Sequence, residues 1–281
     1  MEGLATNGGL ARTAKIFILD TIAIFKLRVT ALVVMTAWAG YYMGAVDSRI
    51  DSFNVTMLNM LVGVGLLSCG SSVLNQVFER RTDALMLRTA QRPLAARRLG
   101  LGYGVLLGMG TVVAGSLWLL ATTNPITATL TLLTVVMYVG IYTPLKRHTT
   151  LATFIGAFPG AMPPLIGWTA ARGRIEWPAV ALFAILFIWQ FPHFMAVAWL
   201  YREDYGRAGI RMLPVVEPDG WSTATEALVY AVLMIPVSLI PYYLHIAGAV
   251  YWVAALLLGV VYLAYTIQFA RITRCSASES R

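Results

Sequence analysis

The amino-acid sequence predicts an all-α bundle of about eight helices that crosses a lipid bilayer. Hydrophobic residues make up 58% of the 281 residues and charged residues only 12%, about half of the ~25% that is usual in soluble globular chains. The apolar runs are continuous rather than alternating, which favours helices over the strands of a membrane barrel. Several charge-free runs also reach the roughly 20 residues that a helix needs to cross the hydrocarbon core.

The predicted spans follow one another without an intervening polar domain, so we expect one integral-membrane domain over residues 1–281. Residues 1–15 are expected to be flexible and residues 271–281 to form a cytoplasmic tail. Two long runs hold two spans each, because turn signals divide them at Thr122–Pro125 and His245–Gly248. The eight predicted spans are Val29–Val46, Ser52–Phe78, two within Leu99–Leu145, Thr149–Ala171, Trp177–Tyr201 and two within Ala227–Ala270.

Lysine and arginine residues gather at one set of span ends. Of the 21 in the chain, only Arg49, Arg172 and Arg174 lie on the other side. Basic loops stay in the cytoplasm, so we expect a multi-pass protein of the inner (cytoplasmic) membrane with both termini in the cytoplasm. This placement accounts for most of the net charge of +8. The charge therefore gives no indication of nucleic-acid binding.

Three polar residues interrupt the apolar pattern at the cytoplasmic end of the second predicted span. Asn75, Glu79 and Asp83 are spaced four apart, so a helix places them on one face. An amide and two carboxylates at the end of a span are costly without a cationic partner. Their oxygen atoms are ligands of the kind that Mg²⁺ prefers. The spacing therefore predicts a magnesium site.

Basic residues surround this predicted metal site. Arg88 and Arg92 follow the acids in the same loop, and Lys146 and Arg147 come from the next cytoplasmic loop. Arginine binds phosphate oxygens through two parallel hydrogen bonds, and lysine binds them as a point charge. Together with Mg²⁺, such residues would bind a diphosphate. From the residues alone, an ion-paired loop cap with anchoring arginines is an equally open interpretation.

Four stretches of the sequence resemble the UbiA-type intramembrane prenyltransferases. Residues 75–94, NQVFERRTDALMLRTAQRPL, look like the first acidic motif of the family, N-x-x-x-(D/E)-x-x-x-D, followed by RT-x-x-RPL. Residues 25–32 (FKLRVTAL), 142–150 (YTPLKRHTT) and 192–216 (PHFMAVAWLYREDYGRAGIRMLPVV) are similar to the branch of the family that farnesylates haem. The match covers roughly residues 25–270.

The resemblance implies a function and a set of site residues. The reaction would transfer the farnesyl group of farnesyl diphosphate to a vinyl group of haem b, with addition of water, giving haem O and diphosphate. Haem b would be a substrate, Mg²⁺ the cofactor, and a haem A synthase or cytochrome oxidase assembly factors further partners. The implied residues are Asn75, Glu79, Asp83 and Asp204 for catalysis and metal binding, Arg88, Arg92, Lys146 and Arg147 for the diphosphate, His193 for haem, and Arg202, Glu203 and Tyr205 in the second motif.

The sequence departs from the family pattern in three ways. Glu79 and Glu203 stand where many members have Asp, and Arg207 follows Glu203 by four residues where a second acid would complete a D-x-x-x-D pair. The missing pair argues against an enzyme acting on a quinone or chlorophyll precursor, which stays the nearer alternative. A transporter is the more distant one, because its polar groups would lie at the bilayer midplane. The family usually has nine spans, whereas this chain shows eight.

Overall fold

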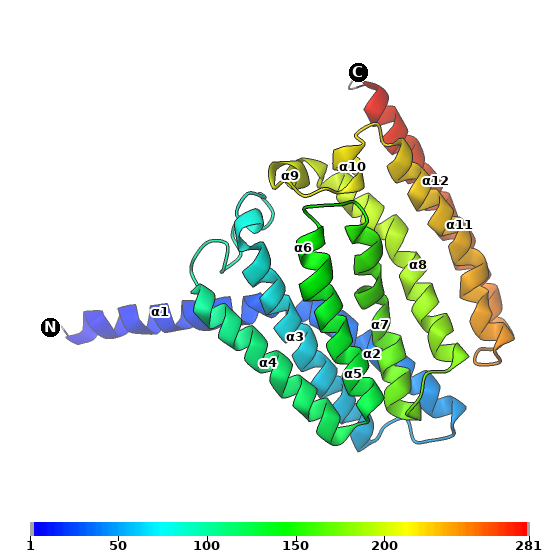
Figure 1. Ribbon diagram of the computed structural model, residues 1–281, viewed down its shortest axis with the longest axis horizontal. Coiled ribbons are helices and arrows are strands. Elements are labelled where there is room, and N and C mark those ends of the chain that lie inside the picture. The colour runs from blue at the N-terminus through cyan, green and yellow to red at the C-terminus, as the bar shows by residue number, and fades with distance from the viewer. Residues whose placement is uncertain (1–2, 280–281) are drawn as a thin grey trace.

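The chain is helical almost throughout in the computed structural model, which describes residues 3–279 and in these residues contains no strand (Figure 1). The π-helical stretch η1 (Val136–Tyr142) joins α5 (Pro125–Val135) to α6 (Thr143–Leu145). These three pieces form one continuous rod, which we call the α5–α6 rod. The elements are α1 (Gly3–Ile24), α2 (Leu27–Asp47), α3 (Val55–Asp83), α4 (Leu101–Thr122), α5 (Pro125–Val135), η1 (Val136–Tyr142), α6 (Thr143–Leu145), α7 (Ala152–Arg172), α8 (Trp177–Leu200), α9 (Arg202–Arg207), α10 (Leu213–Val216), α11 (Trp221–Tyr243) and α12 (Ala249–Glu279).

All eight segments predicted as spans form helices, and both predicted turns fall between helices. Six of these helices within the described residues are long and apolar enough to cross a membrane: α3, α4, the α5–α6 rod, α8, α11 and α12. The predicted count of eight exceeds this number, because α2 and α7 have span length but are not among the six. Helix α7 contains Pro159, Pro163 and Pro164. Most of its residues are buried by its neighbours, so it can be less apolar than a lipid-facing helix.

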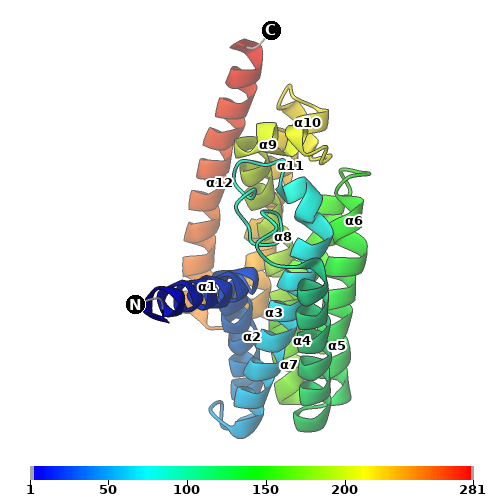
Figure 2. The same ribbon diagram turned by 90° about the vertical axis from the view of Figure 1, so that its left-hand side faces the viewer.

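Both predicted terminal segments are helical where the structure describes them. Residues 3–15, expected to be flexible, begin α1, and residues 271–279, expected to be a tail, continue α12; residues 1–2 and 280–281 lie outside the described part. Helix α1 runs across the side of the bundle instead of along it (Figures 1 and 2). Arg98 donates hydrogen bonds of 2.8 and 3.0 Å to the Asp20 carboxylate, which fixes α1 against the loop that follows α3.

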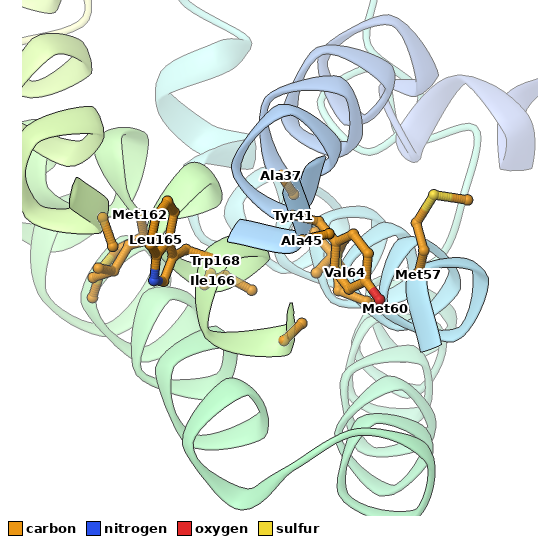
Figure 3. Packing of buried hydrophobic residues seen from close by; sticks show 12 residues of the cluster. Ala37, Tyr41, Ala45, Met57, Met60, Val64, Met162, Leu165, Ile166 and Trp168 are labelled. Atoms are coloured by element: carbon orange, nitrogen blue, oxygen red, sulfur yellow. The ribbon is translucent and has the colours of Figure 1, made fainter. Parts of the chain in front are cut away.

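The centre of the bundle is a close contact between α2 and α7. A Cβ added to Gly167 would lie 1.8 Å from the carbonyl oxygen of Ala37, so only glycine permits this approach of the two backbones. Tyr41 and Trp168 are almost fully buried beside this contact, within a cluster that α3 also joins (Figure 3). The same buried cluster includes residues of α2, α3, α7 and α8, so these four helices pack together.

The loops that carry the two acidic motifs meet at one end of the bundle. The backbone N–H groups of Leu87 and Arg88, in the loop after α3, both donate to the Asp204 carboxylate of α9 at 3.4 Å. Met86 packs against Ala208 and Ile210 beneath this contact. The two motif loops therefore lie at the same end of the bundle, and Figure 1 shows the loop, α9 and α10 together above the bundle.

Candidate active site

The polar face of α3 lines a cavity of about 120 Å³. Asn75 and Asp83 are each only 1% exposed, and Glu79 lies between them on the same face, as the four-residue spacing predicted. We call this space the cation-rich cavity. It is lined by Lys26, Asn75, Glu79, Asp83, Met86, Arg88, Arg92, Tyr138, Tyr142, Lys146, Tyr205, Ile210 and Met212.

Each acid of the cation-rich cavity is paired with a predicted diphosphate-binding residue. Arg92 donates to both oxygens of Asp83 at 2.8 and 2.7 Å, and Lys146 Nζ lies 2.7 Å from Glu79 Oε1. The hydroxyl of Thr89 donates to the Asp83 carbonyl at 2.9 Å, which turns the loop back so that Arg92 faces the helix end. The ion-paired cap and the anion site, left open as alternatives, therefore involve the same residues.

Lys26 also belongs to the site, although its position in the sequence indicates only one of the basic residues on the cytoplasmic side. Its ammonium group donates to Asn75 Oδ1 at 3.1 Å, and Asn75 Nδ2 donates to Thr143 Oγ1 at 3.1 Å. Burial, and next the nearby Arg92 cation, lower the pKa of Lys26 to about 8. The Asn75 amide is thereby fixed between α3, the α1–α2 turn and the start of α6.

The lining of the cation-rich cavity attracts anions. It has two more basic than acidic side chains, because four cations face two carboxylates. Like charges in a confined, partly desolvated space repel one another, so a bound anion relieves this repulsion. The four cations are Lys26, Arg88, Arg92 and Lys146.

An apolar cavity of about 310 Å³ adjoins the cation-rich cavity. Tyr138 and Tyr142 line both. Their rings stack with centroids 5.7 Å apart, and Lys146 Nζ lies 4.3 Å from the centroid of the Tyr142 ring. The apolar cavity lies between α2, α3, the α5–α6 rod, α7 and α8, and its lining contains no charged residue. A molecule with a charged head and an apolar chain would fit across the tyrosine pair.

The second acidic motif lines a different space, which we call the second-motif cavity. It has a volume of about 350 Å³ and is bounded by Leu87, Arg88, residues 200–204 and Arg207. Burial acts to raise the pKa of Asp204, but the N–H groups of Arg88 and Leu87 and the Arg207 guanidinium together lower it. Asp204 also forms an ion pair with Arg207. The carboxylate is therefore already satisfied by the protein.

The four predicted metal ligands are thus not brought together. Asn75, Glu79 and Asp83 share the cation-rich cavity, whereas Asp204 lies in the second-motif cavity. In the described part of the chain, no three Asp, Glu, His or Cys side chains converge as a metal-binding group. Sequence spacing could not show this separation, because it depends on how the loop after α3 folds onto α9.

The remaining predicted site residues take different positions. Tyr205 lines the cation-rich cavity, and Arg202 and Glu203 line the second-motif cavity. Arg147 is exposed and lines none of the three cavities. His193 is also exposed and outside the three cavities, and its ring stacks on Trp189 with centroids 5.2 Å apart. The predicted haem contact of His193 would have to form on the outer face of α8.

Comparison with known proteins defines the class. The model of the UbiA prenyltransferase family matches residues 32–281, and the chain belongs to this family. It is a multi-pass membrane enzyme of the prenyltransferase class.

Individual similar proteins carry a more specific name than the family. A protoheme IX farnesyltransferase of Koribacter versatilis is 52% identical over 240 residues, covering 85% of this chain and 77% of that protein. The protoheme IX farnesyltransferase of Solibacter usitatus is 45% identical over 250 residues, covering 87% and 86%.

Solved structures share the fold at low sequence identity. A digeranylgeranylglyceryl phosphate synthase structure superposes with a TM-score of 0.76 at 16% identity, covering 93% of this chain and 92% of that one. A UbiA homolog from Archaeoglobus fulgidus, bound to DMAPP and Mg²⁺, superposes with a TM-score of 0.67 at 13% identity, covering 90% and 86%.

Proposed function

We propose that this enzyme transfers the farnesyl group of farnesyl diphosphate to a vinyl group of haem b, with addition of water, to give haem O and diphosphate. The acceptor is supported by the two relatives named protoheme IX farnesyltransferase, which are 52% and 45% identical over most of the chain. The donor is supported by one structural observation: a cation-rich cavity and an apolar cavity share Tyr138 and Tyr142.

The two cavities match the two parts of a prenyl diphosphate. The diphosphate lies in the cation-rich cavity, where Lys26, Arg88, Arg92 and Lys146 face it. The isoprenoid chain extends past the tyrosine pair into the apolar cavity, whose volume of about 310 Å³ lies within the roughly 300–1,000 Å³ typical of ligand pockets. The bond to be broken is then at the tyrosine pair.

The residues of the cation-rich cavity fit a bound Mg²⁺. The carboxylates of Glu79 and Asp83 and the side-chain carbonyl of Asn75 offer oxygen ligands, and Mg²⁺ prefers such ligands while retaining waters and substrate phosphates. When bound, Mg²⁺ would neutralise charge that develops on the leaving diphosphate. Arg92 and Lys146 now pair with Asp83 and Glu79, so binding would transfer these cations from the carboxylates to the phosphate oxygens.

The protein side chains would assist the reaction at both products of bond cleavage. Departure of diphosphate from the allylic carbon places negative charge on oxygens that Lys146 and Arg92 can stabilise. The allylic cation that remains would lie against the faces of Tyr138 and Tyr142, which attract positive charge. The surrounding helices keep out water until the vinyl carbon of haem has formed the new C–C bond. Water then adds to the resulting cation and loses a proton, giving the hydroxyl of haem O.

We further propose that the site end of the bundle faces the cytoplasm in the inner membrane. The support is the sequence pattern, in which 18 of 21 lysine and arginine residues belong to the loops and termini assigned to this side. Both termini would then be cytoplasmic, and farnesyl diphosphate would enter from the cytoplasm. A haem A synthase is the class of enzyme that would consume the product.

The experiment that tests the function is incubation of the membrane-reconstituted protein with haem b, farnesyl diphosphate and Mg²⁺, followed by mass spectrometry of the haem. We expect a product that carries one farnesyl and one hydroxyl group, and its loss when Mg²⁺ is chelated. A parallel incubation with an aromatic quinone precursor in place of haem tests the nearer alternative. Prenylation of that precursor with haem left unchanged would overturn the proposal.

A further inference from the structure

We propose that Val64, Thr131 and Ile166 limit the length of the isoprenoid chain that this enzyme accepts. This inference rests on the proposed function, in which the chain extends from the tyrosine pair into the apolar cavity. All three residues line that cavity, and we call them the cavity floor. A closed cavity of fixed depth accepts a chain that fills it and excludes a longer one, because a densely packed protein interior yields little.

The cavity floor is the end of the lining farthest from the cation-rich cavity. Three helices that surround the apolar cavity show this in the same way, although α7 runs in the opposite direction to α3 and the α5–α6 rod. Their lining residues extend from Ser72 to Val64 on α3, from Tyr142 to Thr131 on the rod, and from Gly156 to Ile166 on α7. The lining therefore ends on all three helices at residues of the floor.

The rise of the helices gives the depth of the apolar cavity. Gly156 lies at the level of the tyrosine pair, because a Cβ added to it would be 2.5 Å from Cε2 of Tyr142. Ile166 follows ten residues later on α7, so a rise of 1.5 Å per residue places it about 15 Å farther along. On α3, Val64 lies eleven residues from Asn75 of the cation-rich cavity, which corresponds to about 16 Å.

This depth matches a chain of three isoprene units. The three backbone bonds of one amino-acid residue span about 3.3–3.6 Å when extended, so the four carbon–carbon bonds of one isoprene unit span about 4.5–5 Å. A geranyl chain of two units is then about 9–10 Å long, a farnesyl chain about 14–15 Å and a geranylgeranyl chain about 18–20 Å. The farnesyl chain reaches the cavity floor, and a fourth unit would have to pass through it.

Tight apolar packing supports the cavity floor from below. Val64 and Ile166 are each 2% exposed and belong to the buried cluster that also contains Met60 and Trp168 (Figure 3). Met60 is one turn below Val64 on α3, and it is fully buried. A fourth isoprene unit would therefore overpack this cluster, which is destabilising.

Hydrogen bonds hold the remaining part of the cavity floor. The Thr131 hydroxyl donates to the Thr127 carbonyl at 2.7 Å, so its polar atom is satisfied by its own helix. The Thr127 hydroxyl lies 3.2 Å from that of Thr169 on α7, and Asn124 donates to the Thr169 carbonyl at 2.9 Å. These contacts tie the α5–α6 rod to α7 directly beneath the cavity, so the two helices resist separation by a longer chain.

The test measures donor binding without an acceptor. The probes are the S-geranyl, S-farnesyl and S-geranylgeranyl thiodiphosphates, in which sulfur replaces the bridging oxygen and slows departure of diphosphate. Binding to the lipid-reconstituted protein with Mg²⁺ is measured by displacement of radiolabelled S-farnesyl thiodiphosphate, and only label that excess inorganic diphosphate also displaces is counted.

The unaltered protein should prefer the farnesyl probe over both others. We expect it to bind at least about tenfold more tightly than the geranyl probe, which buries one isoprene unit less. We also expect it to bind at least about tenfold more tightly than the geranylgeranyl probe, whose fourth unit meets the cavity floor.

Two floor variants should shift this preference in opposite directions. Val64→Ala combined with Ile166→Ala removes five carbons, as many as one isoprene unit contains, and should raise the affinity for the geranylgeranyl probe relative to the farnesyl probe at least about tenfold. Val64→Phe fills the floor and should make the geranyl probe bind more tightly than the farnesyl probe. Val73→Ala is the matched control, because Val73 is a fully buried valine of α3 that lines none of the three cavities, and it should keep the order of the three probes.

The outcomes distinguish this inference from the proposed function. Equal binding of the farnesyl and geranylgeranyl probes by the unaltered protein would overturn the role of the cavity floor, and this arm needs no variant to fold. Floor variants that thermal unfolding shows to be folded, yet that keep the original order of the probes, would overturn it as well. Failure of the proposed function is seen separately, because the probes need no haem: it is the absence of farnesylated haem b when the unaltered protein receives both substrates.

Discussion

Asp83→Asn should remove catalysis at a moderate cost in stability. Asp83 is 1% exposed and accepts two hydrogen bonds from Arg92, whose side chain is 25% exposed. Breaking a fully buried ion pair costs about 3–5 kcal/mol, and an exposed pair contributes about 0.2–1 kcal/mol. Because Arg92 retains access to solvent, we expect a loss of about 1–3 kcal/mol in the free energy of unfolding.

The loss of activity in Asp83→Asn should be much larger than this change in stability implies. The substitution removes a proposed carboxylate ligand of Mg²⁺ and leaves the shape of the side chain nearly unchanged. We expect the rate of farnesyl transfer to fall by at least about 100-fold and the Mg²⁺ concentration for half-maximal activity to rise by about 10- to 100-fold. The assay is haem farnesylation at increasing Mg²⁺ concentrations, together with thermal unfolding of the same preparation.

Asp20→Asn is the matched control for this prediction. Asp20 is also a buried aspartate that accepts two hydrogen bonds from an arginine, Arg98, at the same end of the bundle. It lines none of the three cavities, so Asp20→Asn should lose stability yet keep its activity and Mg²⁺ dependence. If both variants lost activity to the same extent, or if Asp83→Asn remained fully active, the assignment of Asp83 to a magnesium–diphosphate site would be refuted.

Three further predictions concern the donor and the acceptor. Lys146→Gln should raise the KM for farnesyl diphosphate about tenfold in steady-state assays, because it removes the cation that lies 2.7 Å from Glu79; an unchanged KM would contradict this. Gly160→Ala should favour geranyl over farnesyl diphosphate in a competition assay, since the added Cβ would lie 2.0 Å from Gln190 Oε1 and displace that side chain within the apolar cavity; an unchanged preference would show that the chain lies elsewhere. His193→Ala should change the optical spectrum or affinity of bound haem and spare the KM for farnesyl diphosphate, and the reverse pattern would remove the haem assignment.

Local periodicity made the α3 part of the site predictable. Asn75, Glu79 and Asp83 are separated by four residues, and one helix carries all three, so no tertiary information was needed to place them on one face. The meeting of the two motif loops could also be predicted, because an even number of spans separates them. Both inferences depend only on helix geometry and on the direction in which each span crosses.

Positions that depend on tertiary contacts could not be predicted in the same way. Lys26 reaches Asn75 because the chain turns between α1 and α2, with Lys26 itself at a positive φ of 49°, and no sequence pattern marks this turn. Asp204 is separated from the α3 acids by backbone donors of a loop with no regular structure. The face of α8 that carries His193 could not be predicted either. Apolar residues lie all around this helix, so a hydrophobic pattern cannot distinguish its lipid-facing from its cavity-facing residues.

The most direct test of the central claim is to follow an isotope label from the farnesyl donor into haem. The protein is reconstituted in lipid with haem b, Mg²⁺ and farnesyl diphosphate that carries deuterium in its isoprenoid chain, and the recovered haem is analysed by mass spectrometry. Our account predicts a single new haem whose mass increases by one fully labelled farnesyl group and one hydroxyl group, with release of diphosphate. Recovery of unchanged haem b, with the label remaining in farnesyl diphosphate or released as farnesol, would contradict it.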